Sequence, residues 1–225
     1  MGDLRRLIVF DLDGTLIDSR RDLAESANQL IGELGGAPLA EEAVGRMVGE
    51  GAAMLVRRAL EAAGIHVPLD TALPRFLAIY DARLLNHTRL YDGIADAVRL
   101  AGRYARLAVL TNKPTAPTER ILTGLGVREL FDEVIGGDGA LPRKPDPAPV
   151  FTLMERAGAT TATTLLVGDS VIDHETARRA SVRCCLATYG FGYATFPPGR
   201  LTGEEWIAAD PWQLKEVLQR FTGGG

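Results

Sequence analysis

Cysteine is scarce in this sequence of 225 residues, which contains only Cys184 and Cys185. The two are adjacent within an apolar run, so they make a poor disulfide pair, and no further cysteine is present to complete a zinc site. Two buried thiols in a reducing compartment fit this pattern best. The scarcity of cysteine therefore favours a cytoplasmic protein.

Long apolar runs are also missing. No stretch approaches the roughly 20 apolar residues that a membrane span needs. The first apolar run, "LIVF" at 7–10, is too short for the core of a signal peptide. We expect a soluble protein with no membrane partner.

An excess of basic charge is absent as well. The chain has 25 Lys and Arg against 29 Asp and Glu, which gives a formal net charge of -4. Nucleic acid is therefore an unexpected partner. The length suits one large domain or two unequal ones, and both a monomer and a homodimer remain open.

Short apolar runs that are rich in β-formers recur along the chain, with helical patterns between them. These runs are nearly continuous rather than alternating, which is typical of strands buried on both faces. We expect strands at 7–10, 107–110, 133–135, 164–167 and 183–189. Strands that alternate with helices predict an α/β fold with a doubly wound parallel sheet, similar to the Rossmann fold.

Residues 20–87 break this rhythm, because they carry helical patterns at 21–35, 52–64 and 71–85 and no convincing strand. We therefore expect a small all-helical domain, 20–87, inserted into an α/β core that consists of 1–19 and 88–225. The stretches near "DSRRD" and "NHTRLYDG" are the expected linkers.

Polar residues follow four of the expected strands. Asp11 and Asp13 follow the first, Thr111 the second, Lys144 the third and the cluster "GDSVID" the fourth. Open α/β sheets bind ligands at the carboxyl ends of their strands, so these groups are expected to meet. Taken singly, each has a structural alternative as a turn former or a helix cap; Ser170 and Asp173, for example, have capping-box spacing.

The ordered set "DLDGTLIDS", "LTNKP", "RKPDPAP" and "GDSVID" resembles the motifs of the haloacid dehalogenase superfamily. The resemblance covers nearly the whole chain, and the helical insert lies where that superfamily places its mobile cap. It implies a phosphatase in which Asp11 attacks phosphorus to form an aspartyl-phosphate and Asp13 is the general acid and base.

The resemblance also implies a cofactor and its ligands. Mg²⁺ is expected to be bound by Asp11, Asp169 and the backbone carbonyl of Asp13. Ser170 and Asp173 are expected outside these ligands, where Asp173 holds waters bound to the metal.

Three further residues of these motifs have expected roles at the phosphoryl group. Lys144 is expected to screen the repulsion between the nucleophile and the phosphate. Thr111 and backbone N–H groups near Asn112 are expected to bind phosphoryl oxygens.

Within the superfamily, the chain is most similar to phosphoglycolate phosphatases, which implies a small phosphorylated metabolite such as 2-phosphoglycolate as substrate. Gly49 and Gly51 of "GEG" are expected to close the cap over it, and Arg57 or Arg58 to pair with its carboxylate, Arg58 being our choice. The alternative for each arginine is a solvated helix position.

Related activities remain open. Asp13 argues against a dehalogenase, and the lack of lysine in 20–87 argues against chemistry through a cap Schiff base. A sugar-phosphate phosphatase, a phosphoglucomutase-like enzyme, a pyrophosphatase or a non-catalytic regulator that binds a phosphorylated ligand shares the same core motifs.

Overall fold

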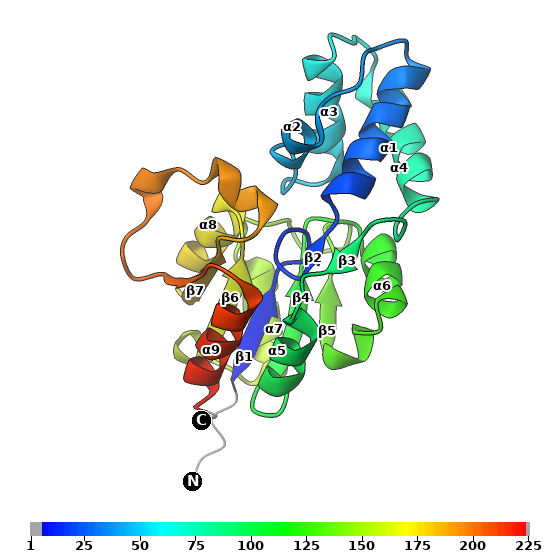
Figure 1. The fold of residues 1–225 in the computed structure, drawn as a ribbon. Helices are drawn as coiled ribbons and strands as arrows, with labels where there is room; N and C mark the ends of the chain where they lie inside the picture. Colours follow the sequence, from blue (N-terminus) through cyan, green and yellow to red (C-terminus); the bar gives the residue numbers. More distant parts are fainter. Residues whose placement is uncertain (1–5, 224–225) are drawn as a thin grey trace.

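The protein consists of a parallel sheet flanked by helices and a group of helices above one end of that sheet (Figure 1). The computed structural model describes residues 6–223. The sheet has six strands in the order β5-β4-β1-β6-β7-β8, and all of its pairings are parallel. The strands are β1 (Leu7–Phe10), β4 (Arg106–Leu110), β5 (Glu133–Ile135), β6 (Thr164–Gly168), β7 (Arg183–Ala187) and β8 (Trp206–Ala208). The predicted doubly wound α/β fold is therefore confirmed.

Helices cover both faces of the sheet, which explains why its strands are apolar throughout. Ile8 and Phe10 of β1 belong to one buried cluster, whereas Leu7 and Val9 belong to another, as the two-residue period of a strand requires. The first face packs against α5 (Ile94–Ala101), α6 (Thr115–Gly124) and α9 (Pro211–Thr222). The second packs against α7 (Ala148–Ala157) and α8 (Val171–Ala180). Cys184 and Cys185 are buried in the sheet as free thiols.

The strand order changes direction at β1. The chain runs from β1 outward through β4 to β5, then returns to β6 on the other side of β1 and continues outward to β8. The loops at the carboxyl ends of β1, β4 and β6 therefore diverge and leave a crevice between them.

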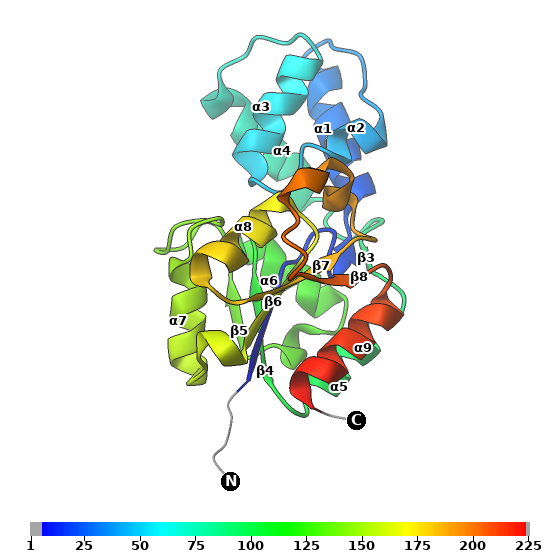
Figure 2. The same ribbon diagram turned by 90° about the vertical axis from the view of Figure 1, so that its left-hand side faces the viewer.

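Four helices make up the insert that follows β1 in the chain, and they lie above the carboxyl ends of the strands (Figure 2). They are α1 (Arg20–Glu33), α2 (Glu41–Gly45), α3 (Ala52–Ala62) and α4 (Leu69–Asp81). The sequence analysis expected three of these helices and missed the five-residue α2. It also did not assign β8 and α9. Among residues 6–223, no helix has the length and apolar character needed to cross a membrane.

A two-stranded antiparallel ribbon joins the insert to the core. The ribbon pairs β2 (Ile17–Asp18) with β3 (Arg89–Leu90), directly outside the expected boundaries of the insert. Asp22, fully buried at the start of α1, accepts hydrogen bonds from the backbone N–H groups of His87 (2.9 Å) and Thr88 (2.8 Å). The two linkers are therefore tied to each other at the base of the insert.

Candidate active site

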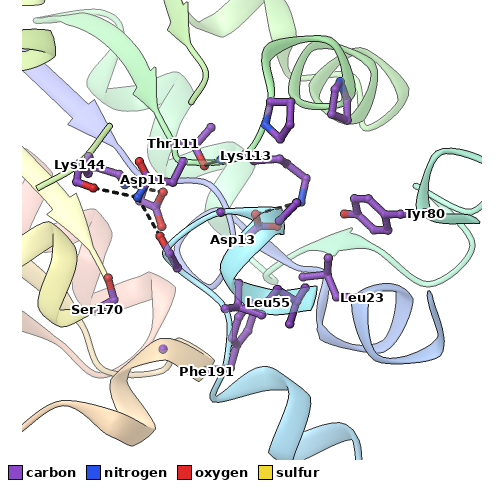
Figure 3. Close-up of a pocket in the computed structure, with 18 of the residues that line it drawn as sticks. Asp11, Asp13, Leu23, Leu55, Tyr80, Thr111, Lys113, Lys144, Ser170 and Phe191 are labelled. Carbon is purple, nitrogen blue, oxygen red and sulfur yellow. Dashed lines mark hydrogen bonds and ion pairs between the residues drawn. The ribbon is translucent and has the colours of Figure 1, made fainter. Parts of the chain in front are cut away.

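The polar residues that follow β1, β4, β5 and β6 meet in one cavity beneath the helical insert (Figure 3). Asp11, Thr111, Lys144 and Asp169 all line it. All four are buried. The cavity has a volume of about 60 Å³. Its size suits a small metabolite.

Lys144 lies at the centre of the charged groups. Its Nζ donates to Oδ1 of Asp11 at 2.7 Å and to Oδ1 of Asp173 at 2.6 Å. Burial alone disfavours the charged form of a lysine, but these two carboxylates outweigh that effect and raise the pKa of Lys144 above its ordinary value. Lys144 is therefore a fixed cation beside Asp11.

Ser170 and Asp173 hold each other at the start of α8. Ser170 donates from its backbone N–H (3.1 Å) and from Oγ (2.6 Å) to Oδ2 of Asp173, and its Oγ accepts from the N–H of Asp173 at 3.4 Å. This is a capping box. Ser170 and Asp173 therefore have the helix-capping role that their spacing allows. The same arrangement places Asp173 in contact with Lys144.

Three carboxylates crowd together on the core side of the cavity. One oxygen from each of Asp11, Asp169 and Asp173 lies within 4.8 Å of the other two. Burial, followed by the charge of Asp173, raises the pKa of Asp11 to about 7 despite Lys144, and burial with the charges of Asp11 and Asp173 raises the pKa of Asp169 well above its ordinary value. One ammonium does not neutralise three buried carboxylates, so the cluster is a suitable site for a divalent cation.

Glycine follows Asp13 because the chain passes very close to Asp169 there. Gly14 has a φ of +88°, and a Cβ at this position would lie 1.9 Å from Oδ2 of Asp169. A side chain would collide with the carboxylate and would also strain the backbone. The glycine of the first motif is therefore explained by the approach of the loops after β1 and β6.

Asp13 is held by two donors. Ser19 Oγ donates to its Oδ1 at 2.5 Å, and Lys113 Nζ lies 3.0 Å from Oδ1 and 2.9 Å from Oδ2. Ser19 precedes α1, so the carboxylate of Asp13 is positioned by one residue beside the insert and one from the loop after β4.

The "GEG" loop of the insert rests on the core at Asn112. The Nδ2 of Asn112 donates to the carbonyl oxygens of Gly49 (2.9 Å) and Lys144 (3.0 Å). Gly51 has a φ of +88°, and a Cβ there would lie 3.2 Å from the carbonyl oxygen of Asn112. Both glycines line the cavity. The structure thus brings Gly49, Gly51 and Asn112 together, with the Asn112 amide joining the insert to the core.

Arg58 does not line the cavity. Its Nη2 forms an ion pair with Glu50, and its Nη1 donates to the carbonyl oxygen of Met47 at 3.2 Å. Arg57 is exposed on the surface of α3. The expected pairing of Arg58 with a substrate carboxylate therefore has no support in the structure, because the carboxylate of Glu50, in the loop before α3, binds the guanidinium.

Three residues at the cavity were not assigned from the sequence. Lys113 belongs to the motif "LTNKP", in which only Thr111 and Asn112 have expected roles, and Tyr80 is one of several aromatic residues on helices of the insert. Gly192 lies in a 3₁₀ helix, Phe191–Thr195, and donates its N–H to Oδ2 of Asp169 at 2.7 Å. No local pattern marks Gly192, because its role depends on a loop that returns to the site 23 residues after Asp169.

Known proteins resemble the chain over most of its length. A phosphoglycolate phosphatase of Pseudomonas putida KT2440 is 42% identical over 197 residues, which cover 85% of this chain and 72% of the relative. A phosphoglycolate phosphatase of Rhodospirillum rubrum is 41% identical over 83% of this chain and 80% of its own length. The crystal structure of a predicted phosphoglycolate phosphatase from Haemophilus somnus 129PT superimposes with a TM-score of 0.88 at 32% identity, covering 96% of this chain and 99% of that one.

A family model described as haloacid dehalogenase-like hydrolase matches residues 8–187. This span runs from β1 to the end of β7, so it contains the insert and every residue of the carboxylate cluster. The chain belongs to the haloacid dehalogenase-like hydrolase family.

Proposed function

We propose that this phosphoric monoester hydrolase acts on 2-phosphoglycolate, with Mg²⁺ as cofactor and Asp11 as nucleophile. The observation that carries the mechanism is the position of Asp11, whose carboxylate lines a small cavity together with Asp13, Thr111 and Lys144. The names of the relatives support the substrate. We also propose that the enzyme is cytoplasmic and that residues 20–87 form its cap domain.

The donor set at the cavity fits Mg²⁺. Carboxylate oxygens are the ligands that this ion prefers, and Asp11 and Asp169 supply two of them, with the backbone carbonyl of Asp13 as the proposed third. Asp173 holds Lys144 and Ser170 behind these ligands. When bound, Mg²⁺ neutralises carboxylate and phosphoryl charge that otherwise repel each other.

The first half of the reaction uses Asp11 and Asp13. A carboxylate oxygen of Asp11 forms a bond to phosphorus while the phosphorus–ester oxygen bond breaks, and Asp13 gives a proton to the departing alkoxide. Lys144 beside Asp11 and the hydroxyl of Thr111 offset the negative charge that gathers on the phosphoryl oxygens.

The second half uses the same residues in reverse. Asp13, now a carboxylate, takes a proton from water, and the oxygen of that water forms a bond to phosphorus as the bond to Asp11 breaks. Inorganic phosphate leaves and Asp11 is a carboxylate again. Two moderate barriers replace the single large barrier of direct phosphate-ester hydrolysis.

Turnover of a panel of phosphate compounds tests this proposal. We expect 2-phosphoglycolate to have a higher kcat/KM than glucose 6-phosphate, AMP or pyrophosphate. Activity should vanish in EDTA and return with Mg²⁺, and Ca²⁺ should replace it poorly because it is larger and less strict in its coordination. Full activity after complete metal removal contradicts the cofactor, and a better substrate among the other compounds contradicts the choice of 2-phosphoglycolate.

A further inference from the structure

Lys113 supplies a buried positive charge on the leaving-group side of the cavity. It follows β4 and lines the cavity, its side chain is 6% exposed, and its Nζ contacts both carboxylate oxygens of Asp13 (Figure 3). Asp13 is the residue proposed to touch the ester oxygen. The ammonium of Lys113 would therefore lie next to the leaving group, on the far side of the ester oxygen from phosphorus.

The side chains that the insert contributes to the cavity are apolar around Lys113. They include Leu55 of α3 and Phe76 and Leu77 of α4. The ring of Tyr80, also from α4, lies with its centroid 4.7 Å from the Lys113 Nζ. An aromatic face attracts an ammonium without neutralising it, so the charge of Lys113 remains available to a second anion.

Within residues 6–223, Lys113 is paired with one carboxylate, whereas the other cation of the cavity is paired with two. Lys113 and Lys144 are the cationic side chains among the described residues that line it. Lys144 is engaged by Asp11 and Asp173 at the phosphoryl side. Arg58, the cation favoured from the sequence, points to Glu50 and lies outside the cavity.

We propose that Lys113 recognises a carboxylate on the leaving group of the substrate. This inference rests on the proposed function and names the residue that selects its substrate class, a short phosphorylated acid. In 2-phosphoglycolate the carboxyl carbon is two bonds from the ester oxygen. A substrate with that oxygen at Asp13 thus brings its carboxylate alongside the Lys113 ammonium.

The surroundings strengthen this contact and limit the size of the acid. An ion pair is stronger where apolar side chains replace water. When Lys113 turns from Asp13 to the substrate, Ser19 still holds Asp13. Leu55, Phe76 and Leu77 offer no hydrogen bonds to the hydroxyl groups of a sugar phosphate, which therefore loses polar contacts on entering.

A comparison of 2-phosphoglycolate with ethyl phosphate tests the role of Lys113. Ethyl phosphate has nearly the same shape but a methyl group in place of the carboxylate. In the wild type we expect a higher kcat/KM for 2-phosphoglycolate. In Lys113→Met the ratio of the two kcat/KM values should fall at least ~30-fold, mostly through KM, because a buried charge pair loses one partner. Taking the ratio cancels any effect of the variant on Asp13, which acts on both substrates.

Two further variants keep the test decisive. Lys113→Arg retains the charge and should keep most of the wild-type ratio. Lys113→Gln is a second neutral variant, to be used if Lys113→Met does not fold, and should lower the ratio in the same way. An unchanged ratio in the neutral variants, or a fall in Arg58→Met in place of Lys113→Met, overturns the inference.

The outcomes separate this inference from the proposed function. If the wild type prefers 2-phosphoglycolate and the neutral Lys113 variants keep that preference, only the role of Lys113 is overturned. If the wild type hydrolyses phosphate esters but does not prefer 2-phosphoglycolate over ethyl phosphate, both the proposed substrate and the role of Lys113 are overturned.

Discussion

The two walls of the cavity differ in chemistry. The wall formed by the core carries charged and hydroxyl groups, including Asp11, Lys144 and Asp169, at the ends of parallel strands. The wall formed by the insert is apolar, with Leu55 and Phe76 as examples. The difference indicates a division of tasks. In the proposed mechanism, the sheet edge would hold the reacting groups in place, while the helical insert would exclude water and restrict what can enter.

Among residues 6–223, few contacts near the cavity connect the two walls. Asn112 donates to the carbonyl oxygen of Gly49, and Tyr80 lies against Lys113. Because these contacts are few, the division of tasks can be tested by changing one wall at a time.

Asp11→Asn removes the nucleophile from the core wall and should have the largest effect. We expect no turnover of any phosphate ester above background, because an amide cannot form the acyl phosphate. Steady-state assays measure the loss, and circular dichroism with thermal melting checks that the variant is folded. Continued turnover by this variant contradicts the assignment of Asp11.

Asp13→Asn removes the acid and base but leaves the nucleophile. General acid–base catalysis contributes roughly 10²–10⁴-fold, so turnover of 2-phosphoglycolate should fall by about that factor. p-Nitrophenyl phosphate has a leaving group that needs no proton, so it should still phosphorylate Asp11. Mass spectrometry should then find a phosphate adduct on the peptide containing Asp11. An adduct on Asp13 in the wild type would reverse the two roles.

Metal binding should depend on pH through the carboxylates of the core wall. With its pKa raised to about 7, Asp11 of the metal-free protein holds a proton that a metal must displace. Affinity for Mg²⁺ should therefore rise about tenfold per pH unit below pH 7 for each proton released. Isothermal titration calorimetry in buffers of different ionisation enthalpy measures that release. The affinity of Asp11→Asn should be lower and should rise less steeply with pH.

The same raised pKa affects folding. A carboxyl group whose pKa is higher in the folded state stabilises the protein below its unfolded pKa, and that contribution is lost as the pH rises toward about 7. Saturating Mg²⁺ should therefore raise the melting temperature more at about pH 8 than at about pH 5. An equal increase at both pH values would indicate that Asp11 is not a ligand.

Leu77→Ala changes the insert wall and should have the smallest effect. Removing this half-buried side chain widens the cavity. A difference of a few methylene groups in an apolar pocket changes the ratio of kcat/KM between two substrates by roughly 10-fold or more. The kcat/KM for larger esters such as glucose 6-phosphate should rise about tenfold relative to 2-phosphoglycolate. Leu73→Ala on the same helix is a matched control, since Leu73 is also half-buried but does not line the cavity. Equal effects of the two variants would show that the insert wall does not select substrates.

Local patterns were enough to predict five of the six strands of the sheet and the motif residues of the core. The strands expected at 7–10, 107–110, 133–135 and 164–167 are present within a residue, because strands buried on both faces are apolar at every position. The motifs directly follow those strands, so the parallel topology alone brings Asp11, Thr111 and Asp169 to one edge. The short β8 and α2 lack such a pattern, and neither was expected.

The sequence by itself determined the α/β core, the helical insert and the acidic motifs that follow the strands, because each depends on the period of apolar residues or on neighbours in the chain. Only the tertiary structure decided which cation reaches the substrate cavity. Arg58 and Lys113 look equally available in the sequence, but Glu50 holds Arg58 outside the cavity. Lys113 is buried between Asp13, 100 residues away in the chain, and Tyr80 of α4. Contacts over such separations are set by how the insert packs on the core, and the sequence around a lysine carries no record of them.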